Sequence, residues 1–334
     1  MAEEGDIHEQ LVEAMSQISG RHDGRRTVHA KGVWCEGSFT PTPEGAELCR
    51  AAALSGDPVT ALVRFSSSSG DPEVHDAQRS GGGMAVKLRP EGGDEWDILA
   101  TGTPVFVART PEDFLELVRL RKPDPETGQP DMEKLGEYLQ RHPEAQLSIQ
   151  STLGAEPPAS FVTVPYQSPH AFKLLAPDGG ETWARWRWRP EAGEARLPDD
   201  EARAKGRDYL GAEIAERLRS GSAAFDFVLQ LAGDDDSLTD PTELWPPERI
   251  TVDAGTLEIT AVVDDPEGDG HIEVFDPMRL PDGIEPSDDP EGDGHIEVFD
   301  PTRLPDGIEP SDDPILHARP KAYSVSAYRR LGQA

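Results

Sequence analysis

Residues 319–332 read RPKAYSVSAYRRLG and contain the most informative pair of side chains in the chain. Arg319 and Tyr323 are four positions apart, so a helix would place them on one face. A guanidinium group close to a phenol favours the phenolate, and a phenolate is an anionic oxygen ligand suited to ferric haem iron. An amphipathic helix with a packed tyrosine accounts for the same pair, and on these two residues alone it is the simpler explanation.

Short motifs elsewhere in the chain follow one another in a characteristic order. Each is weak alone, but the ordered set resembles the haem catalases over residues 20–334, and most of all the short catalase-related peroxidases, which lack the C-terminal extensions of large catalases. The motifs are RTVHAKG (26–32), VRFS (63–66), GMAVK (83–87), TPVFVAR (103–109), HAFKLL (170–175), LWPPER (244–249), FDPTRLPDGIEPSDD (299–313) and RPKAY (319–323).

The local patterns predict many short strands and a few helices. Runs such as 58–66 and 83–90, broken by Gly and Pro, are typical of strands, and residues 183–189 alternate Trp with Arg, as in a strand with one buried face. Together with the resemblance this predicts an α+β, mainly β fold: a catalase-like antiparallel β-barrel with helical insertions, comprising an N-terminal helix and arm (1–24) and a haem domain (25–334). Helices are expected at 6–19, 110–122, 132–143 and 201–221.

The resemblance also implies a site built around heme b with ferric iron. His29 would be the distal acid and base, moving a proton between the two oxygens of a bound peroxide, and Ser66 would orient it by a hydrogen bond. Tyr323 would be the proximal iron ligand and Arg319 its charge partner. The remaining implied contacts are Arg26, Arg64 and Arg330 with the haem propionates, Val28 and Phe106 in the distal pocket, Phe114 stacked near the haem, and His170 on the proximal side. An ordinary buried histidine explains His170 equally well.

Thr101 departs from the catalase pattern. It lies in WDILATGTP (96–104), at the position where catalases carry a distal Asn. A carboxamide donates from a fixed plane, whereas a hydroxyl is shorter and rotates. Disproportionation requires a second peroxide to be held, so this step should suffer most. The resemblance therefore implies a peroxidase that reduces organic hydroperoxides and hydrogen peroxide through a ferryl intermediate, uses an electron donor, and has weak catalase activity.

Three other functions stay open on the sequence. The first is a true catalase that tolerates Thr101. The second is a haem isomerase or dehydratase of fatty-acid hydroperoxides. The third is an acidic protein without catalytic activity that sequesters calcium or haem.

A tandem duplication precedes the C-terminal motif. Residues 264–287 recur as residues 288–311, with Thr302 replacing Met278 as the one difference. The second copy runs into RPKAY with the spacing of the family, so the first copy is expected to be a looped-out insertion. Both copies contain DPEGDGHIEVFD, which resembles a calcium loop but ends in Asp276 or Asp300 instead of the bidentate Glu, so calcium binding is not expected.

Composition excludes several function classes. The chain has 32 Lys and Arg against 64 Asp and Glu, a formal charge of -32, which would repel nucleic-acid phosphates. Its two cysteines form neither a disulfide framework nor a metal-ligand spacing. The N-terminus lacks the features of a signal peptide, and no stretch is long and apolar enough for a membrane span. We therefore expect a cytoplasmic protein, with a homodimer as the working hypothesis for its assembly.

Overall fold

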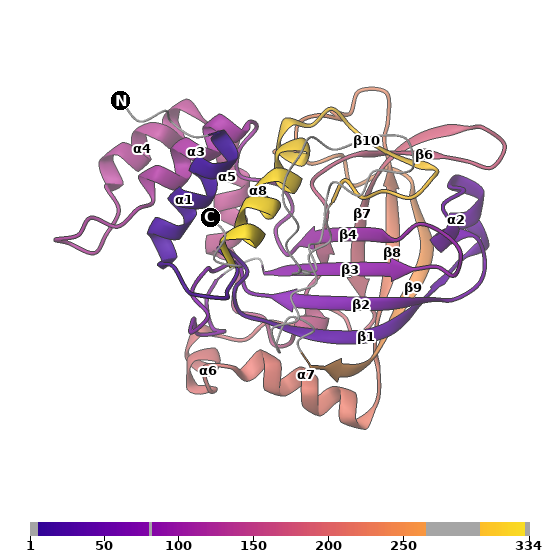
Figure 1. Ribbon diagram of the computed structural model, residues 1–334, viewed down its shortest axis with the longest axis horizontal. Coiled ribbons are helices and arrows are strands. Elements are labelled where there is room, and N and C mark those ends of the chain that lie inside the picture. Colours follow the sequence, from indigo (N-terminus) through magenta and orange to yellow (C-terminus); the bar gives the residue numbers. More distant parts are fainter. Residues whose placement is uncertain (1–5, 80–81, 265–300, 331–334) are drawn as a thin grey trace, which may run out of the picture.

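The computed structural model describes residues 6–79, 82–264 and 301–330 (Figure 1). Its centre is one antiparallel sheet in the order β10-β6-β7-β5-β4-β3-β2-β1-β9-β8, and an additional pairing of β7 with β8 closes eight of these strands into a barrel. The predicted antiparallel barrel is confirmed. The strands are β1 (Gly32–Pro41), β2 (Val59–Ser66), β3 (Gly83–Arg89), β4 (Trp96–Thr101), β5 (Tyr166–Gln167), β6 (Phe172–Leu175), β7 (Glu181–Pro190), β8 (Ala223–Leu231), β9 (Thr251–Val263) and β10 (Ile308–Pro310).

Large aromatic side chains fill the barrel. Trp96, Trp188 and Phe227 are fully buried and pack edge-on or tilted against their neighbours, which is the preferred geometry of aromatic rings. The alternation in β7 holds for Trp186 and Trp188, which face this core. Arg185 departs from it, because its buried guanidinium lies over the ring of Trp245 and donates to the backbone carbonyls of residues 240 and 243.

The helices follow the sequence pattern with one correction. Thr110 caps α3 through its side chain, as its position before Pro111 predicts. The single helix expected at 201–221 is wrong: a break at residues 205–208 divides it, and the Asp76 carboxylate accepts from the backbone N–H of Leu210 in the first turn of the second part. The helices are α1 (Ile7–Ser19), α2 (Pro43–Leu48), α3 (Pro111–Leu120), α4 (Met132–Arg141), α5 (Ala145–Gly154), α6 (Asp199–Ala204), α7 (Tyr209–Ser220) and α8 (Pro314–Arg330).

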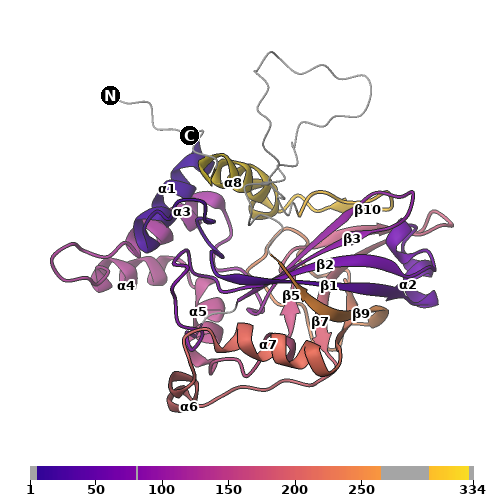
Figure 2. The same cartoon turned by 60° about the horizontal axis from the view of Figure 1, so that its bottom comes forward.

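Helices α1, α3 and α8 gather at one end of the barrel, while α7 lies along another side (Figures 1 and 2). Two elements far apart in the sequence, α1 and α8, are joined by ion pairs of Asp6 with Lys321 and of Glu13 with Arg329. Helix α8 contains Pro320, which cannot donate to the carbonyl four residues earlier. None of the helices in the described ranges is long and apolar enough to cross a lipid bilayer.

The end of the second sequence copy is docked on the barrel. Arg303 pairs with Asp97 at 3.0 Å, Asp306 pairs with Arg50 at 2.6 Å, and β10 joins β6. This segment leads directly into α8. Both calcium-loop-like stretches, and the first copy beyond Asp264, lie outside the described residues; that the first copy is the insertion remains our proposal.

Candidate functional site

A cavity lies between α8 and the strands β2, β3 and β4. Its lining includes most of the residues that the sequence singled out. They come from the loop before β1, from β2, from the end of β4 and from α8. These are Arg26, Val28, His29, Arg64, Ser66, Thr101, Arg319, Tyr323 and Arg330.

His29 is held in an unusual backbone conformation. Its φ of 57° is the only positive value of a residue other than glycine in the described part of the chain, and such strain costs roughly 1–3 kcal/mol. Arg64 stabilises this conformation by donating from Nη2 to the His29 carbonyl at 2.8 Å. The imidazole Nδ1 lies 3.0 Å from the Ser66 hydroxyl oxygen. Backbone and ring of His29 are thus both held in place.

Gly83 makes room for this imidazole. A Cβ atom at residue 83 would lie 3.0 Å from Cε1 and 3.1 Å from Nδ1 of His29, and 3.2 Å from the Ser66 hydroxyl. These distances are tighter than ordinary van der Waals contact, so a side chain at this position would displace the ring.

The environment keeps His29 neutral. Burial, followed by the positive charges of Arg64 and Arg319, lowers its pKa from the ordinary 6.5 to about 4. A neutral imidazole can accept a proton at pH 7, as a general base must.

Tyr323 begins a chain of hydrogen bonds on the opposite wall. Arg319 donates from Nε to the phenol oxygen at 2.9 Å and from Nη1 to His170 Nε2 at 3.0 Å. Because a guanidinium only donates, Nε2 of His170 accepts, and Nδ1 therefore carries the hydrogen donated to Asp313 at 2.6 Å. Burial lowers the pKa of His170, in keeping with this neutral form. Asp313 also accepts from the N–H of Ile315 in the first turn of α8, so one carboxylate anchors both helix and hydrogen-bond chain.

Three expected haem contacts do not line the cavity. His170 lies behind Arg319, which it contacts directly. Phe106 and Phe114 pack against each other with ring centroids 5.0 Å apart, and Phe114 adjoins the cluster between α1 and α3. The sequence reasoning missed Val12 and Met15 of α1, which do line the cavity. Their spacing of three residues showed a buried helix face, but nothing in it indicated which cavity that face would reach.

Comparisons with known proteins point to a single family. The family described as Catalase matches residues 7–291. A catalase-related peroxidase of Mycolicibacterium paratuberculosis is 39% identical over 287 residues, which is 84% of this chain and 88% of that protein. The catalase-related peroxidase of Synechococcus elongatus is 31% identical over 283 residues, covering 85% of this chain and 84% of that protein.

The chain belongs to the catalase family. Among solved structures, catalase A from Saccharomyces cerevisiae superposes with a TM-score of 0.76 at 23% identity, covering 96% of this chain and 64% of the yeast protein. A fungal catalase gives the same score and identity, with 93% of this chain and 60% of that protein covered. The chain thus spans less than two thirds of these longer catalases. The matched family segment ends before α8, so the assignment of Arg319 and Tyr323 depends on their own geometry.

Catalases are haem proteins, and the cavity has the chemistry to hold haem. The phenol of Tyr323, bonded to a guanidinium, and the imidazole of His29 both line this cavity, so Tyr323 would hold the iron and His29 would act on a bound peroxide. Met84 and Leu99 contribute apolar wall, suited to a porphyrin plane. Arginines of the lining can pair with carboxylate groups: Arg26, Arg64 and Arg330.

Thr101, at the position where the resemblance to catalases implies an Asn, has a hydroxyl that is bonded within its own loop. Its hydroxyl oxygen lies 2.6 Å from the Thr103 hydroxyl and accepts from the Thr103 N–H at 3.1 Å. It also lies 3.2 Å from the Thr103 carbonyl oxygen. The hydroxyl is therefore engaged within its own loop, although the residue lines the cavity.

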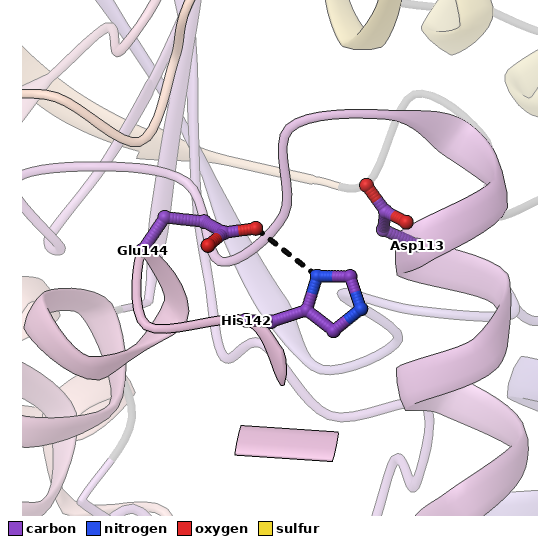
Figure 3. A group of neighbouring side chains, drawn as sticks. All are labelled: Asp113, His142 and Glu144. Atoms are coloured by element: carbon purple, nitrogen blue, oxygen red, sulfur yellow. Dashed lines mark hydrogen bonds and ion pairs between the residues drawn. The ribbon is translucent and has the colours of Figure 1, made fainter. Parts of the chain in front are cut away.

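A second cluster of metal-ligand residues lies away from this cavity (Figure 3). The side chains of Asp113, His142 and Glu144 approach within 4.8 Å of one another. The His142 ring bonds Glu144 at 3.0 Å and stacks on Tyr138 with centroids 4.2 Å apart. Asp113 lies in the first turn of α3, where an acidic residue is favourable. The His142–Glu144 bond thus joins the end of α4 to the start of α5.

Proposed function

We propose that this chain is a haem-dependent peroxidase that reduces organic hydroperoxides and hydrogen peroxide, with weak catalase activity. One observation carries the proposal: the bonded pair Tyr323–Arg319 and the bonded pair His29–Ser66 line the same cavity. The Thr101 hydroxyl, in contrast, is bonded to Thr103. The names of its relatives, catalase-related peroxidases and catalases, agree with it. Heme b, a small-molecule electron donor, a cytoplasmic location and a homodimer belong to the same proposal.

Each residue has a distinct task in this function. Tyr323, whose phenol oxygen accepts a hydrogen bond from the guanidinium of Arg319, would bind the ferric iron, and the haem would supply the redox chemistry. Neutral His29 takes the proton from the inner oxygen of the hydroperoxide and returns it to the outer oxygen, so that water or an alcohol leaves. Ser66 fixes the plane of the ring throughout.

The direct test is an absorption spectrum of the haem-loaded protein, followed by mixing with hydrogen peroxide or an organic hydroperoxide. A high-spin ferric tyrosinate spectrum, slow oxygen release and faster oxidation of a reducing dye are expected. Vigorous oxygen release would establish the second candidate, a true catalase, which some of the relatives are by name. Rearranged product without consumption of a reductant would instead mark an isomerase or dehydratase.

Thr101→Asn is expected to raise oxygen release from hydrogen peroxide. The carboxamide can donate to a second peroxide, which the engaged threonine hydroxyl does not. A hydrogen bond worth roughly 1–1.5 kcal/mol corresponds to about a tenfold increase. Oxygen evolution is measured by electrode beside dye oxidation as an internal reference. Equal oxygen release from both proteins would show that this position does not limit catalase activity.

Activity is expected to persist into acid. His29 acts as a base only when neutral, and its lowered pKa of about 4 keeps it neutral until the pH falls through that value. The rate of hydroperoxide consumption, measured across the acid range, should therefore fall with a midpoint near pH 4. A midpoint near the ordinary histidine value of 6.5 would contradict the lowered pKa.

Gly83→Ala is expected to lower kcat/KM for hydroperoxides by less than the roughly 100-fold that a misplacement of about 1 Å can cost, because the new Cβ, 3.0 Å from Cε1 of His29, requires the ring to shift by only part of that distance. Gly136→Ala in α4 is the matched control, since its Cβ would meet nothing within 4 Å. The control should keep full activity and gain roughly 0.5–1 kcal/mol of stability. Unchanged kinetics in Gly83→Ala would show that the His29 position is not tightly constrained.

A further inference from the structure

A second cavity adjoins the first. It has a volume of ≈ 590 Å³ and lies between α1, the loop that follows it and the end of α8. Arg26, Thr27 and Arg330 line both cavities, so these side chains form a common wall. A cavity of this size suits a small organic molecule.

This cavity is basic in a strongly acidic protein. Five arginines line it, against the two carboxylates of Glu9 and Asp23. Glu13 adds a third carboxylate, which pairs with both Arg21 and Arg329. Among the residues that the structure describes, five positive charges face three negative ones at this cavity, whereas the chain as a whole carries -32. The arginines are Arg21, Arg25, Arg26, Arg329 and Arg330.

The arginines differ in what holds them. Glu13 fixes the guanidinium of Arg329 at 3.2 Å. Arg25 is exposed and makes no ion pair with any residue that the structure describes. Guanidinium groups recognise carboxylates and sulfonates through paired hydrogen bonds. Arg25 is therefore placed to bind an anion from solvent, and Arg329 lies preorganised in the same cavity.

We propose that this cavity binds an anionic one-electron reductant that carries a carboxylate, and thereby sets the electron-donor preference of the enzyme. The inference rests on the proposed peroxidase function, in which Arg26 and Arg330 lie at the propionate edge of the haem. A donor seated beyond them would lie next to that edge. In the overall reaction the O–O bond of one hydroperoxide breaks with a gain of two electrons. Two donor molecules each lose one electron and one proton, so that one alcohol, one water and two donor radicals form.

The test compares two phenols that differ mainly in charge: para-hydroxyphenylacetate, an anion, and para-cresol, which is neutral. Arg25→Gln and the double variant Arg25→Gln/Arg329→Gln are compared with Arg219→Gln, an exposed arginine of α7 that pairs with Glu216. The double variant is expected to raise KM for the anion by about tenfold or more, since hydrogen bonds to charged groups contribute roughly 1.5–3 kcal/mol. Arg25→Gln alone should raise KM for the anion while its kcat and its KM for para-cresol, and both constants of Arg219→Gln, stay unchanged. Arg329 also pairs with Glu13, so a change of kcat that appears in the double variant alone reports on that ion pair and not on the anion site.

Binding of para-hydroxyphenylacetate is measured separately by titration calorimetry, on haem-loaded and haem-free protein. We expect heat of binding that salt weakens and that the double variant loses. An enzyme that oxidises both phenols with equal KM, unaffected by the variants, would overturn the donor site and leave the peroxidase function standing. Calorimetric binding without turnover of any hydroperoxide would overturn the peroxidase function, and with it the reductant role of the cavity.

Discussion

His29→Gln is expected to lower kcat/KM for hydroperoxides by roughly 10²- to 10⁴-fold, the usual contribution of a positioned acid and base. Glutamine is close to histidine in size but cannot take up and return a proton at neutral pH. Haem content should not change, because Tyr323 and Arg319 lie on another wall. Stopped-flow mixing with an organic hydroperoxide, at matched haem content, measures the effect.

Ser66→Ala is the companion variant, because it keeps the imidazole and removes the hydrogen bond at Nδ1. It should cost less than His29→Gln and mainly loosen the ring. If the two variants were equally active, or if His29→Gln retained the rate of the unmodified protein, another group would have to be the proton carrier.

Tyr323→Phe is expected to give the second large effect, a loss of more than about 100-fold in haem affinity, since even partners of metal ligands cost 10- to 100-fold. The phenylalanine ring fills the same space but offers no oxygen to iron, and Arg319 loses an acceptor. Haem titration followed by absorption measures the affinity, and the ferric tyrosinate spectrum should be lost.

Tyr328→Phe on the same helix is the control. Its side chain is 44% exposed and is not in the lining of the cavity. It should bind haem as the unmodified protein does. If the absorption spectrum were the same with and without the Tyr323 hydroxyl, Tyr323 would not be the iron ligand. A protein without catalytic activity would then be the favoured interpretation.

The sequence predicted the parts of the site that depend on local spacing. Arg319 and Tyr323 bond to each other because a helix brings positions four apart together. The contact of Ser66 with His29 joins residues far apart in the chain, and only the family resemblance implied it. The sequence could not predict contacts that only the closed barrel creates. The placement of His170 behind Arg319 is such a contact, since these residues are far apart in the chain. The positive φ of His29 likewise depends on Arg64 from a neighbouring strand.

Other features depended on individual side-chain contacts that the local sequence patterns do not show. The helical pattern over 201–221 has no proline to break it, yet Asp76 from a distant loop binds the N–H of Leu210 and fixes a new helix start. The Thr101 hydroxyl bonds the neighbouring Thr103, which the composition of the loop alone did not indicate.

The junction of α1 with α8 has a consequence for how the protein is made. As the chain leaves the ribosome, the barrel strands β1 to β9 emerge before α8, which supplies Arg319 and Tyr323. Pro320 deprives this helix of one internal hydrogen bond, so it gains stability mainly by docking against α1 and the barrel. A nascent chain stalled after β9 would already contain His29 but not Tyr323. With Tyr323 as the proposed iron ligand, haem would be held only after translation has passed residue 323.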